Sequence, residues 1–169
     1  MEFRILRGHE VKEAVELIQR TFLQDIAPYY DPQGANNFTK THNEESYLLE
    51  MRKNKYLLIG AFEEQLVGVA GIRNFSHLRT LFVDKSYQSQ YIGTRLLEYV
   101  KNLISGPLTV NATPRAVSFY QKNGFIQTNE EQHENGVCFV PMVYHSHNEN
   151  KFDNYNQVHE FIGMQKDRV

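Results

Sequence analysis

The stretch from Leu78 to Leu97 constrains the fold more than any other part of the chain. Residues 78–83 are rich in apolar and β-branched side chains, which is typical of a short strand. From Ile92 onwards, apolar side chains recur at helical spacing. The loop between them, residues 84–93, is mainly polar and has its only glycine, Gly93, at the end. A strand therefore turns tightly into a helix, whose unpaired first N–H groups favour a phosphate.

This turn carries a motif in which Gln88, Tyr91 and Gly93 hold the decisive positions. It resembles the pyrophosphate-binding motif of the GNAT acetyltransferases, whose core reads Arg or Gln, two residues, Gly, one residue, then Gly or Ala. Gln88 and Gly93 match this core, whereas Tyr91 stands in the place of the first glycine. Glycine lets the loop backbone approach the phosphates closely. We expect Tyr91 to be tolerated if its ring points outward and its φ is negative.

A second stretch, from Leu108 to Phe125, resembles the strand, helix and Gly-Phe ending of the same family. Asn111, Tyr120 and Gly124 stand at the expected separations. A single polar turn before a helix is a weak signal, because such turns are common. The two motifs together are a much stronger one.

The resemblance implies an α/β fold with a mixed, mostly antiparallel twisted sheet of about seven strands and helices on both faces. It also implies that two central strands splay apart to admit the cofactor. The spacing of apolar residues predicts a helix over residues 11–22 and another from about Asn43. Residues 28–37, with two prolines and a glycine, predict an irregular segment. We expect strands at residues 3–6, 56–62, 65–72, 77–83, 108–111, 125–127 and 136–144, and a further helix at 114–122.

Two local signals refine this prediction. Thr113 is suited to cap a helix that has Pro114 at its first position, and Gly124 is suited to end it. Pro141 lacks a backbone N–H, so the last strand should carry a bulge or leave that position unpaired.

The chain fits one domain followed by a tail. It has 169 residues, of which 41% are hydrophobic and 22% charged, as in an ordinary protein with a core. The resemblance covers residues 1–145. Residues 146–169 form a polar extension whose spaced apolar side chains allow a short helix docked on the domain or on a second subunit. A homodimer is therefore allowed, and no pattern requires it.

Charge and cysteine content narrow the choice of partners. The formal net charge is −2 and no basic cluster stands out, so we expect neither nucleic acid nor membrane as a partner. No apolar run approaches the roughly 20 residues of a membrane span, and the N-terminus lacks a signal-peptide core. The single cysteine, Cys138, excludes an internal disulfide and fits a reducing compartment. We expect a cytoplasmic protein.

Two further groups have ordinary structural explanations. His145 and His147 lie in a polar stretch with no third ligand at a recognised spacing, so we expect no metal. Cys138 falls in an apolar strand far from both motifs, where we expect a buried structural thiol rather than a nucleophile.

The resemblance implies that acetyl-CoA is the cosubstrate and assigns residues to it. A backbone N–H of the strand at Leu81 to Val83 would face the thioester oxygen, where an oxyanion develops. Tyr120 matches the tyrosine that gives a proton to the departing thiolate. Asn111 would bind the pantetheine arm or orient a water, although an asparagine at a strand end also serves as a turn former. The predicted cofactor-binding residues are Leu81, Phe82, Val83, Gln88, Ser89, Gln90, Tyr91, Ile92, Gly93, Thr94, Asn111 and Tyr120.

Acetyl transfer to an amine also needs a proton acceptor, because a primary amine is mostly protonated at neutral pH. His77 has a suitable pKa and stands at the start of the strand that leads to the cofactor loop. Strict alternation would put His77 on the same face as Arg79 and Leu81. Competing candidates lie in the segment where this family shapes its acceptor site: Glu44, Glu45, Asp31 and Tyr30.

The resemblance therefore predicts an N-acetyltransferase that moves an acetyl group from acetyl-CoA to a primary amine by direct transfer in a ternary complex. Tyr91 keeps open an alternative, a non-catalytic acyl-CoA-binding domain that senses or regulates. A second alternative is an interaction domain whose cofactor site has decayed and whose contact surface includes Tyr29, Tyr30 and the tail. The sequence leaves the identity of the acceptor amine open.

Overall fold

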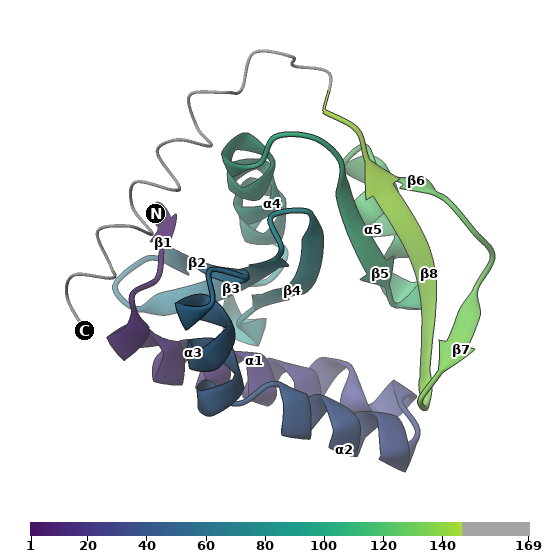
Figure 1. The fold of residues 1–169 in the computed structure, drawn as a ribbon, viewed down its shortest axis with the longest axis horizontal. Coiled ribbons are helices and arrows are strands. Elements are labelled where there is room, and N and C mark those ends of the chain that lie inside the picture. Colours follow the sequence, from purple (N-terminus) through teal and green to yellow (C-terminus); the bar gives the residue numbers. More distant parts are fainter. Residues whose placement is uncertain (147–169) are drawn as a thin grey trace.

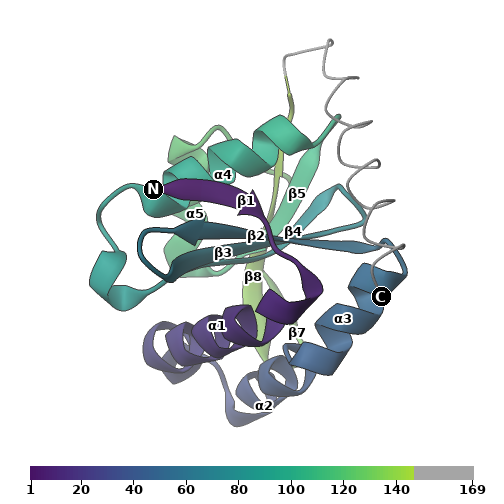
Figure 2. The ribbon, with the colours of Figure 1, turned by 90° about the vertical axis from the view of Figure 1, so that its left-hand side faces the viewer.

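The computed structural model describes residues 1–146, which form one sheet with helices on both faces (Figures 1 and 2). The sheet order is β1-β2-β3-β4-β5-β8-β6, and β7 pairs with β8. Among these strands the β4–β5 pair is parallel and the others are antiparallel. The predicted mixed, mostly antiparallel sheet is confirmed. The strands are β1 (Glu2–Ile5), β2 (Tyr56–Phe62), β3 (Leu66–Arg73), β4 (His77–Val83), β5 (Leu108–Ala112), β6 (Ile126–Gln127), β7 (Gln132–Glu134) and β8 (Val137–Tyr144).

The helices divide between the two faces of the sheet. α1 and α3 lie on one face and α4 lies on the other, as Figure 2 shows for strands β2 to β4. Each face has its own apolar core, and α5 shares the core of the α4 face. The helices are α1 (Val11–Asp25), α2 (Pro32–Thr41), α3 (Glu44–Arg52), α4 (Ile92–Leu103) and α5 (Val117–Lys122), with single 3-10 turns at Gly8–Glu10, Ala27–Tyr29, Lys85–Tyr87 and Pro114–Ala116.

The amphipathic stripe predicted for the first helix is present in α1. Its buried side chains include Val11, Ala14, Ile18 and Phe22, which pack on the sheet together with residues of β2, β3 and β4. Burying a side chain of this size stabilises the fold by roughly 1.5–3 kcal/mol. Apolar periodicity therefore decides where α1 lies.

The parallel strands β4 and β5 pair only at one end. Their register joins His77 to Thr109 and Leu78 to Val110, and beyond these pairs the two strands diverge (Figure 1). β4 continues to pair with β3 along its whole length. The two strands therefore splay apart and leave an open edge on β4, as the family resemblance implied.

A β-bulge interrupts β4 at Arg79. Leu78 lies opposite Ile72, but Thr80 lies opposite Gly71, so Arg79 has no partner on β3. A bulge of one residue reverses which side chains face which side of the sheet. Arg79 consequently lies on the α1–α3 face, near the rings of Tyr47 and Tyr56, whereas Leu81 packs with the core of the α4 face. The prediction that Arg79 and Leu81 share one face is wrong for this reason.

Residues 32–41, predicted to lie mostly in an irregular segment, form the helix α2. The Asp31 side chain caps it by accepting a hydrogen bond from the Gly34 N–H at 2.7 Å, and Pro32 occupies the first turn. The poor helix formers inside this segment are offset by the burial of Phe38, which stacks on Phe22 with ring centroids 3.7 Å apart.

The second motif folds largely as expected. Gly124 ends α5 with φ of +84°, and the N–H of Phe125 bonds to the carbonyl of Tyr120. Pro114 begins a 3-10 turn that continues into α5, and Thr113 precedes this turn without a side-chain capping bond.

Pro141 stays in the β5–β8 register without a bulge, so the expected bulge or unpaired position does not occur on that side of β8. Against β5 the register continues through Pro141, which lies opposite Asn111. On the other side, the Pro141 carbonyl accepts a hydrogen bond from the Thr128 N–H at 2.9 Å, while the proline has no N–H to donate. The chain leaves the sheet there, between β6 and the short strand β7, which the sequence did not predict.

The polar extension predicted for residues 146–169 falls, from residue 147 onwards, outside the described residues, as does His147. Within residues 1–146, no helix is both long and apolar enough to span a membrane.

Candidate active site

Backbone N–H groups gather between β4 and α4. The N–H groups of residues 89–94 have no acceptor in the described part of the chain, and the first bond of α4 runs from the Arg95 N–H to the Tyr91 carbonyl. Unpaired donors at a helix start carry partial positive charge and favour an anion. The turn thus presents unpaired backbone donors where the sequence predicts a phosphate site.

The side chains of this loop hold it in place. Asp84 accepts a hydrogen bond from Arg20 at 2.6 Å, and it also caps the turn by accepting from the Ser86 N–H at 3.0 Å. Gln88 Nε2 donates to Asp25 Oδ2 at 2.8 Å and to the Val83 carbonyl at 3.1 Å. Gln88, the motif residue, therefore ties the loop to α1 and β4 and leaves the outward surface to backbone donors.

Tyr91, which stands in the place of the first motif glycine, meets one of the two expectations for it and not the other. Its side chain is 79% exposed, so the ring does point outward. Its φ is +59°, in the left-handed region, where we expected a negative value. Ser89 has φ of +62° as well. Left-handed backbone costs a residue with a Cβ about 1–2 kcal/mol, so the loop keeps a glycine-like conformation under strain.

The open edge of β4 offers two further donors. The Asp84 N–H bonds to Val67 on β3, and the alternation of the antiparallel ladder then directs the N–H groups of Leu81 and Val83 toward β5. β5 does not pair with β4 at these positions. Such fixed donors suit a developing oxyanion.

The start of α4, the end of β4 and α5 meet at Gly93. A Cβ added to Gly93 would lie 3.6 Å from the ring of Phe119 and 3.7 Å from Val83. The next residue on α5, Tyr120, is buried and contacts the rings of Phe119 and Phe125. Burial raises the pKa of Tyr120, so its phenol stays protonated at neutral pH.

The remaining predicted cofactor residues differ in how they are placed. Phe82 and Ile92 are buried in the cores of opposite faces. Ser89 and Gln90 are exposed, and Thr94 is half-buried. Asn111 is exposed on β5, where its neighbours Val110 and Ala112 face the α4–α5 core. Asn111 and Tyr120 therefore lie on different faces of the sheet.

His77 lies at the closed end of the strand pair. Its Nδ1 is 2.8 Å from Thr109 Oγ1 on β5. Burial, followed by the charges of Arg73 and Arg79, lowers the pKa of His77, so the ring is neutral at neutral pH. At about 3.3 Å per residue, His77 is on the order of 13 Å from Leu81 along the strand.

The other predicted proton acceptors have structural roles or open surroundings. Asp31 caps α2, and Glu44 and Glu45 lie in the first turn of α3, where both are exposed. Tyr30 is half-buried against Phe22, and burial, with a smaller effect of Cys138, raises the pKa of Tyr30.

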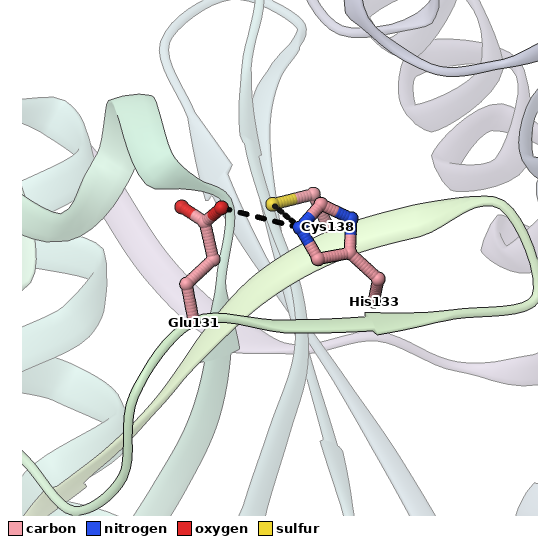
Figure 3. Close-up of side chains that lie close together, drawn as sticks. All are labelled: Glu131, His133 and Cys138. Carbon is pink, nitrogen blue, oxygen red and sulfur yellow. Dashed lines mark hydrogen bonds and ion pairs between the residues drawn. The ribbon is translucent and has the colours of Figure 1, made fainter.

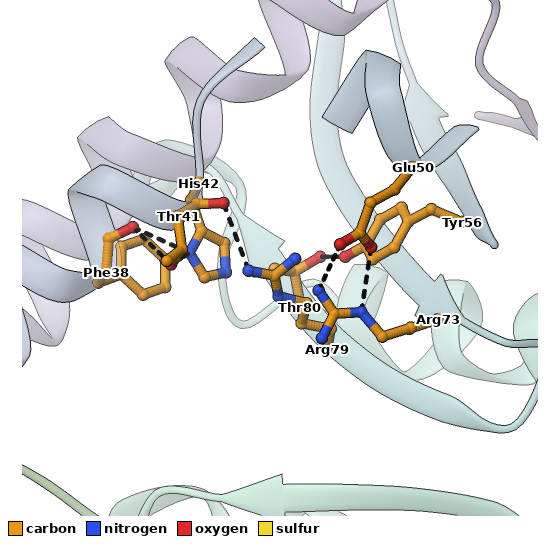
Figure 4. A network of polar contacts seen from close by, with 8 residues as sticks. All are labelled: Phe38, Thr41, His42, Glu50, Tyr56, Arg73, Arg79 and Thr80. Carbon is orange, nitrogen blue, oxygen red and sulfur yellow. Dashed lines mark hydrogen bonds and ion pairs between the residues drawn. The ribbon is translucent and has the colours of Figure 1, made fainter. Parts of the chain in front are cut away.

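A polar cluster on the α1–α3 face was not predicted from the sequence (Figure 4). Tyr56 Oη lies 3.4 Å from Thr80 Oγ1, and Gly71 leaves the room for this contact. Arg79 donates to the Thr41 carbonyl at 3.3 Å and has no carboxylate within ion-pair distance among residues 1–146. A half-buried guanidinium without a counter-ion suits an anionic ligand.

His42 is the most perturbed member of this face. It stacks on Phe38 with ring centroids 3.7 Å apart, and its Nδ1 lies 2.9 Å from the Phe38 carbonyl. Its Nε2 and the Tyr47 hydroxyl are buried without a partner in the described residues. Burial, with the charge of Arg79, lowers the pKa of His42 to about 3. A sequence signal existed only in the crowding of aromatic residues around residues 38–47.

Cys138 departs from its predicted buried position. It is partly exposed on β8, and its Sγ lies 3.7 Å from His133 Nε2 on β7. The neighbouring Glu131 raises the pKa of the Cys138 thiol to about 11. A thiol with a raised pKa is a poor nucleophile at neutral pH.

Comparison with known proteins gives a family match over most of the chain. The family model described as an acetyltransferase (GNAT) domain matches residues 26–146. A comparison with curated protein sequences finds no match.

Solved structures share the fold. A GCN5-related N-acetyltransferase from Rhodopseudomonas palustris has a TM-score of 0.72 at 19% identity, over 86% of this chain and 95% of that chain. The PaiA N-acetyltransferase from Thermoplasma acidophilum, in complex with coenzyme A, has a TM-score of 0.68 at 19% identity, over 86% and 100%. An aminoglycoside 6'-N-acetyltransferase complexed with coenzyme A has a TM-score of 0.60 at 13% identity, over 86% and 97%.

Proposed function

Because the chain belongs to the GNAT acetyltransferase family, we propose that it transfers an acetyl group from acetyl-CoA directly to a primary amine within a ternary complex. The observation that carries this proposal is the group of unpaired N–H donors at residues 89–94 beside the open edge of β4. Two structural neighbours, PaiA and the aminoglycoside acetyltransferase, are described with coenzyme A.

In this proposal, different groups of donors bind different parts of the cofactor. The pyrophosphate lies on the N–H groups before and within the first turn of α4, where the helix dipole adds to their attraction. The pantetheine arm then follows the open edge of β4, with Asn111 as its proposed contact on β5. The thioester oxygen accepts from the N–H of Leu81 or Val83, which stabilises the oxyanion.

The transfer step forms one bond and breaks one. The amine nitrogen attacks the thioester carbon, and the tetrahedral intermediate expels the coenzyme A thiolate. Tyr120 gives the thiolate a proton, and the nitrogen releases one as the amide forms, which restores the phenol of Tyr120. The raised pKa of Tyr120 keeps that proton in place until sulfur becomes negatively charged.

The attacking amine must first lose a proton. We propose that His77 accepts it through water, because the ring is neutral at neutral pH and its distance from Leu81 excludes direct contact. Asp31, Tyr30, Glu44 and Glu45 are the alternatives. The acceptor would approach from the α2–α3 side, where Arg79 and the cluster of Figure 4 present polar side chains.

The experiment measures acetylated product by mass spectrometry with a panel of primary amines, including polyamines, amino acids and aminoglycosides. Tyr120→Phe should lower kcat by about 100-fold or more and leave coenzyme A binding unchanged. Tyr144→Phe is the matched control, because Tyr144 also contacts Phe125 in the same core. An unchanged kcat in Tyr120→Phe would show that Tyr120 is not the acid.

Tyr91 motivates the alternative of a non-catalytic acyl-CoA-binding domain. The strained left-handed conformation places a bulky residue where the family motif has glycine. Binding of acetyl-CoA without acetylation of any amine in the panel would favour this alternative.

A further inference from the structure

Three side chains with metal-binding atoms meet on the β7–β8 hairpin (Figure 3). They are Glu131, His133 and Cys138, whose ligand atoms all lie within 4.8 Å of one another. None of them has a place in the acetyl transfer proposed above. These residues stand at no recognised ligand spacing in the sequence, from which we expect no metal.

The backbone register brings these side chains together. His133 lies directly opposite Cys138 in the antiparallel pairing of β7 and β8. Side chains that face each other across such a pair lie on the same side of the sheet. Glu131 lies just before β7, and its carboxylate reaches to within 3.4 Å of His133 Nε2 on that side. The cluster is thus fixed by the hairpin.

The distances match those around one tetrahedral metal ion. Cys138 Sγ lies 3.7 Å from His133 Nε2, and His133 Nε2 lies 3.4 Å from Glu131 Oε1. Zinc bond lengths at a tetrahedral angle give about 3.6 Å between sulfur and nitrogen, and about 3.3 Å between nitrogen and oxygen. The third distance, between Cys138 Sγ and the Glu131 carboxylate, is at most 4.8 Å, against about 3.6 Å around zinc, so a cation would draw these two side chains together by about 1 Å at most.

We propose that the β7–β8 hairpin binds a single Zn²⁺ ion through Cys138 Sγ, His133 Nε2 and a carboxylate oxygen of Glu131. One sulfur, one nitrogen and one oxygen ligand form a set that suits a borderline-soft cation, whereas Mg²⁺ and Ca²⁺ prefer oxygen ligands throughout. Three protein ligands leave the fourth tetrahedral position to water.

The ion would stiffen a hairpin that closes against α2. The turn at Gly136 lies so close to this helix that a Cβ on Gly34 would collide with the Gly136 carbonyl. Figure 1 shows the N-terminal end of α2 beside this turn. By joining β7 to β8, the metal fixes the position of the turn against the α2 side of the molecule.

The test uses Co²⁺ as a spectroscopic probe on the full chain. Cys138 is the only cysteine, so a thiolate-to-cobalt absorption band can arise only at this site. We expect one equivalent of Co²⁺ to produce the band and Zn²⁺ to abolish it by displacement. Cys138→Ser should remove the band, and His133→Ala should weaken Zn²⁺ binding by about tenfold or more. Glu134→Gln, on the opposite side of β7, is the matched control and should bind as the unchanged chain does.

A second measurement, the alkylation of Cys138, tests metal binding in variants that keep the cysteine. Zn²⁺ should slow the alkylation of Cys138 by iodoacetamide in the unchanged chain, and should have no such effect in His133→Ala, which keeps the cysteine. Absence of the cobalt band in the unchanged chain would overturn the proposal. Equal protection of Cys138 in the unchanged chain and in both His133→Ala and Glu131→Gln would overturn it as well, since the thiol would then bind metal alone.

Discussion

The loop before α4 and the α2–α3 side of the sheet differ in which polar groups they leave available, namely backbone groups in the loop and side-chain groups on the α2–α3 side. In the loop, the N–H groups of residues 89–94 have no acceptor among residues 1–146, while Asp84 and Gln88 turn their side chains back to other elements. On the α2–α3 side, the buried polar groups without a partner in the same part of the chain belong to side chains, among them His42 and Tyr47. Donors that belong to the backbone remain when a side chain changes, and the loop keeps them with Tyr91 in the place of a glycine. A surface made of side chains depends on the identity of each residue.

The largest expected effect is on coenzyme A binding, from Gly93→Glu. A carboxylate in the first turn of α4 would repel the pyrophosphate at the N–H groups, so we expect no measurable binding by calorimetry. An acidic residue is favourable at a helix start, so loss of the fold would not explain this result.

Gly93→Ala is the control for this substitution. Its Cβ would meet Phe119 at an ordinary contact distance of 3.6 Å, so binding should persist. Equal binding by the Glu variant and the unchanged chain would contradict a phosphate site made of backbone.

The second largest effect is on the free energy of unfolding, which we expect His42 on the α2–α3 side to make dependent on pH. His42 is neutral in the folded protein because its pKa is lowered to about 3, but an unfolded histidine takes up a proton below about pH 6.5. Its contribution to stability is therefore complete above pH 6.5 and is lost as the pH falls toward 3. At pH 4.5 the loss should be about 2–3 kcal/mol in the free energy of unfolding.

His42→Phe isolates the pH-dependent contribution of His42 to stability, because a phenyl ring can keep the stack on Phe38 and does not titrate. Urea unfolding at pH 7 and pH 4.5 should show a smaller loss for the variant than for the unchanged chain. Carboxylates elsewhere affect both proteins alike. The same loss in both would mean that His42 is not held neutral by burial.

The smallest expected effect is on the Tm, and it comes from the strained backbone of Tyr91 in the loop before α4. Tyr91→Gly should relieve the left-handed strain of about 1 kcal/mol and raise the Tm by about 2–4 °C, with coenzyme A binding kept or improved. Gln90→Gly is the control, because Gln90 is not in the left-handed region and should gain nothing. Equal shifts in Tm for both variants would show that the φ of Tyr91 is not the cause.

Much of the fold could be predicted, because apolar periodicity and turn residues act locally. The stripe of α1, the strand–turn–helix at residues 78–97 and the glycine stop at Gly124 are all readable in this way. The helix α2 was missed because Pro32 and Gly34 read as breakers, although Asp31 followed by proline is also a helix-start signal.

Features that depend on strand pairing could not be predicted from local patterns. The bulge at Arg79 arises between β3 and β4, and it alone decides which face Arg79 occupies. The contact between Cys138 and His133 likewise depends on the register of a hairpin whose first strand has only three residues. The strand–turn–helix with its unpaired donors was predictable because these donors are backbone groups, which need only the turn itself.

The most direct test is calorimetric titration of the full chain with acetyl-CoA, with coenzyme A in parallel. The account predicts that both ligands bind at one site in the micromolar range, and that Gly93→Glu removes binding of both. Absence of binding by either ligand to the unchanged chain would contradict the phosphate site before α4 and favour an interaction domain whose cofactor site has decayed.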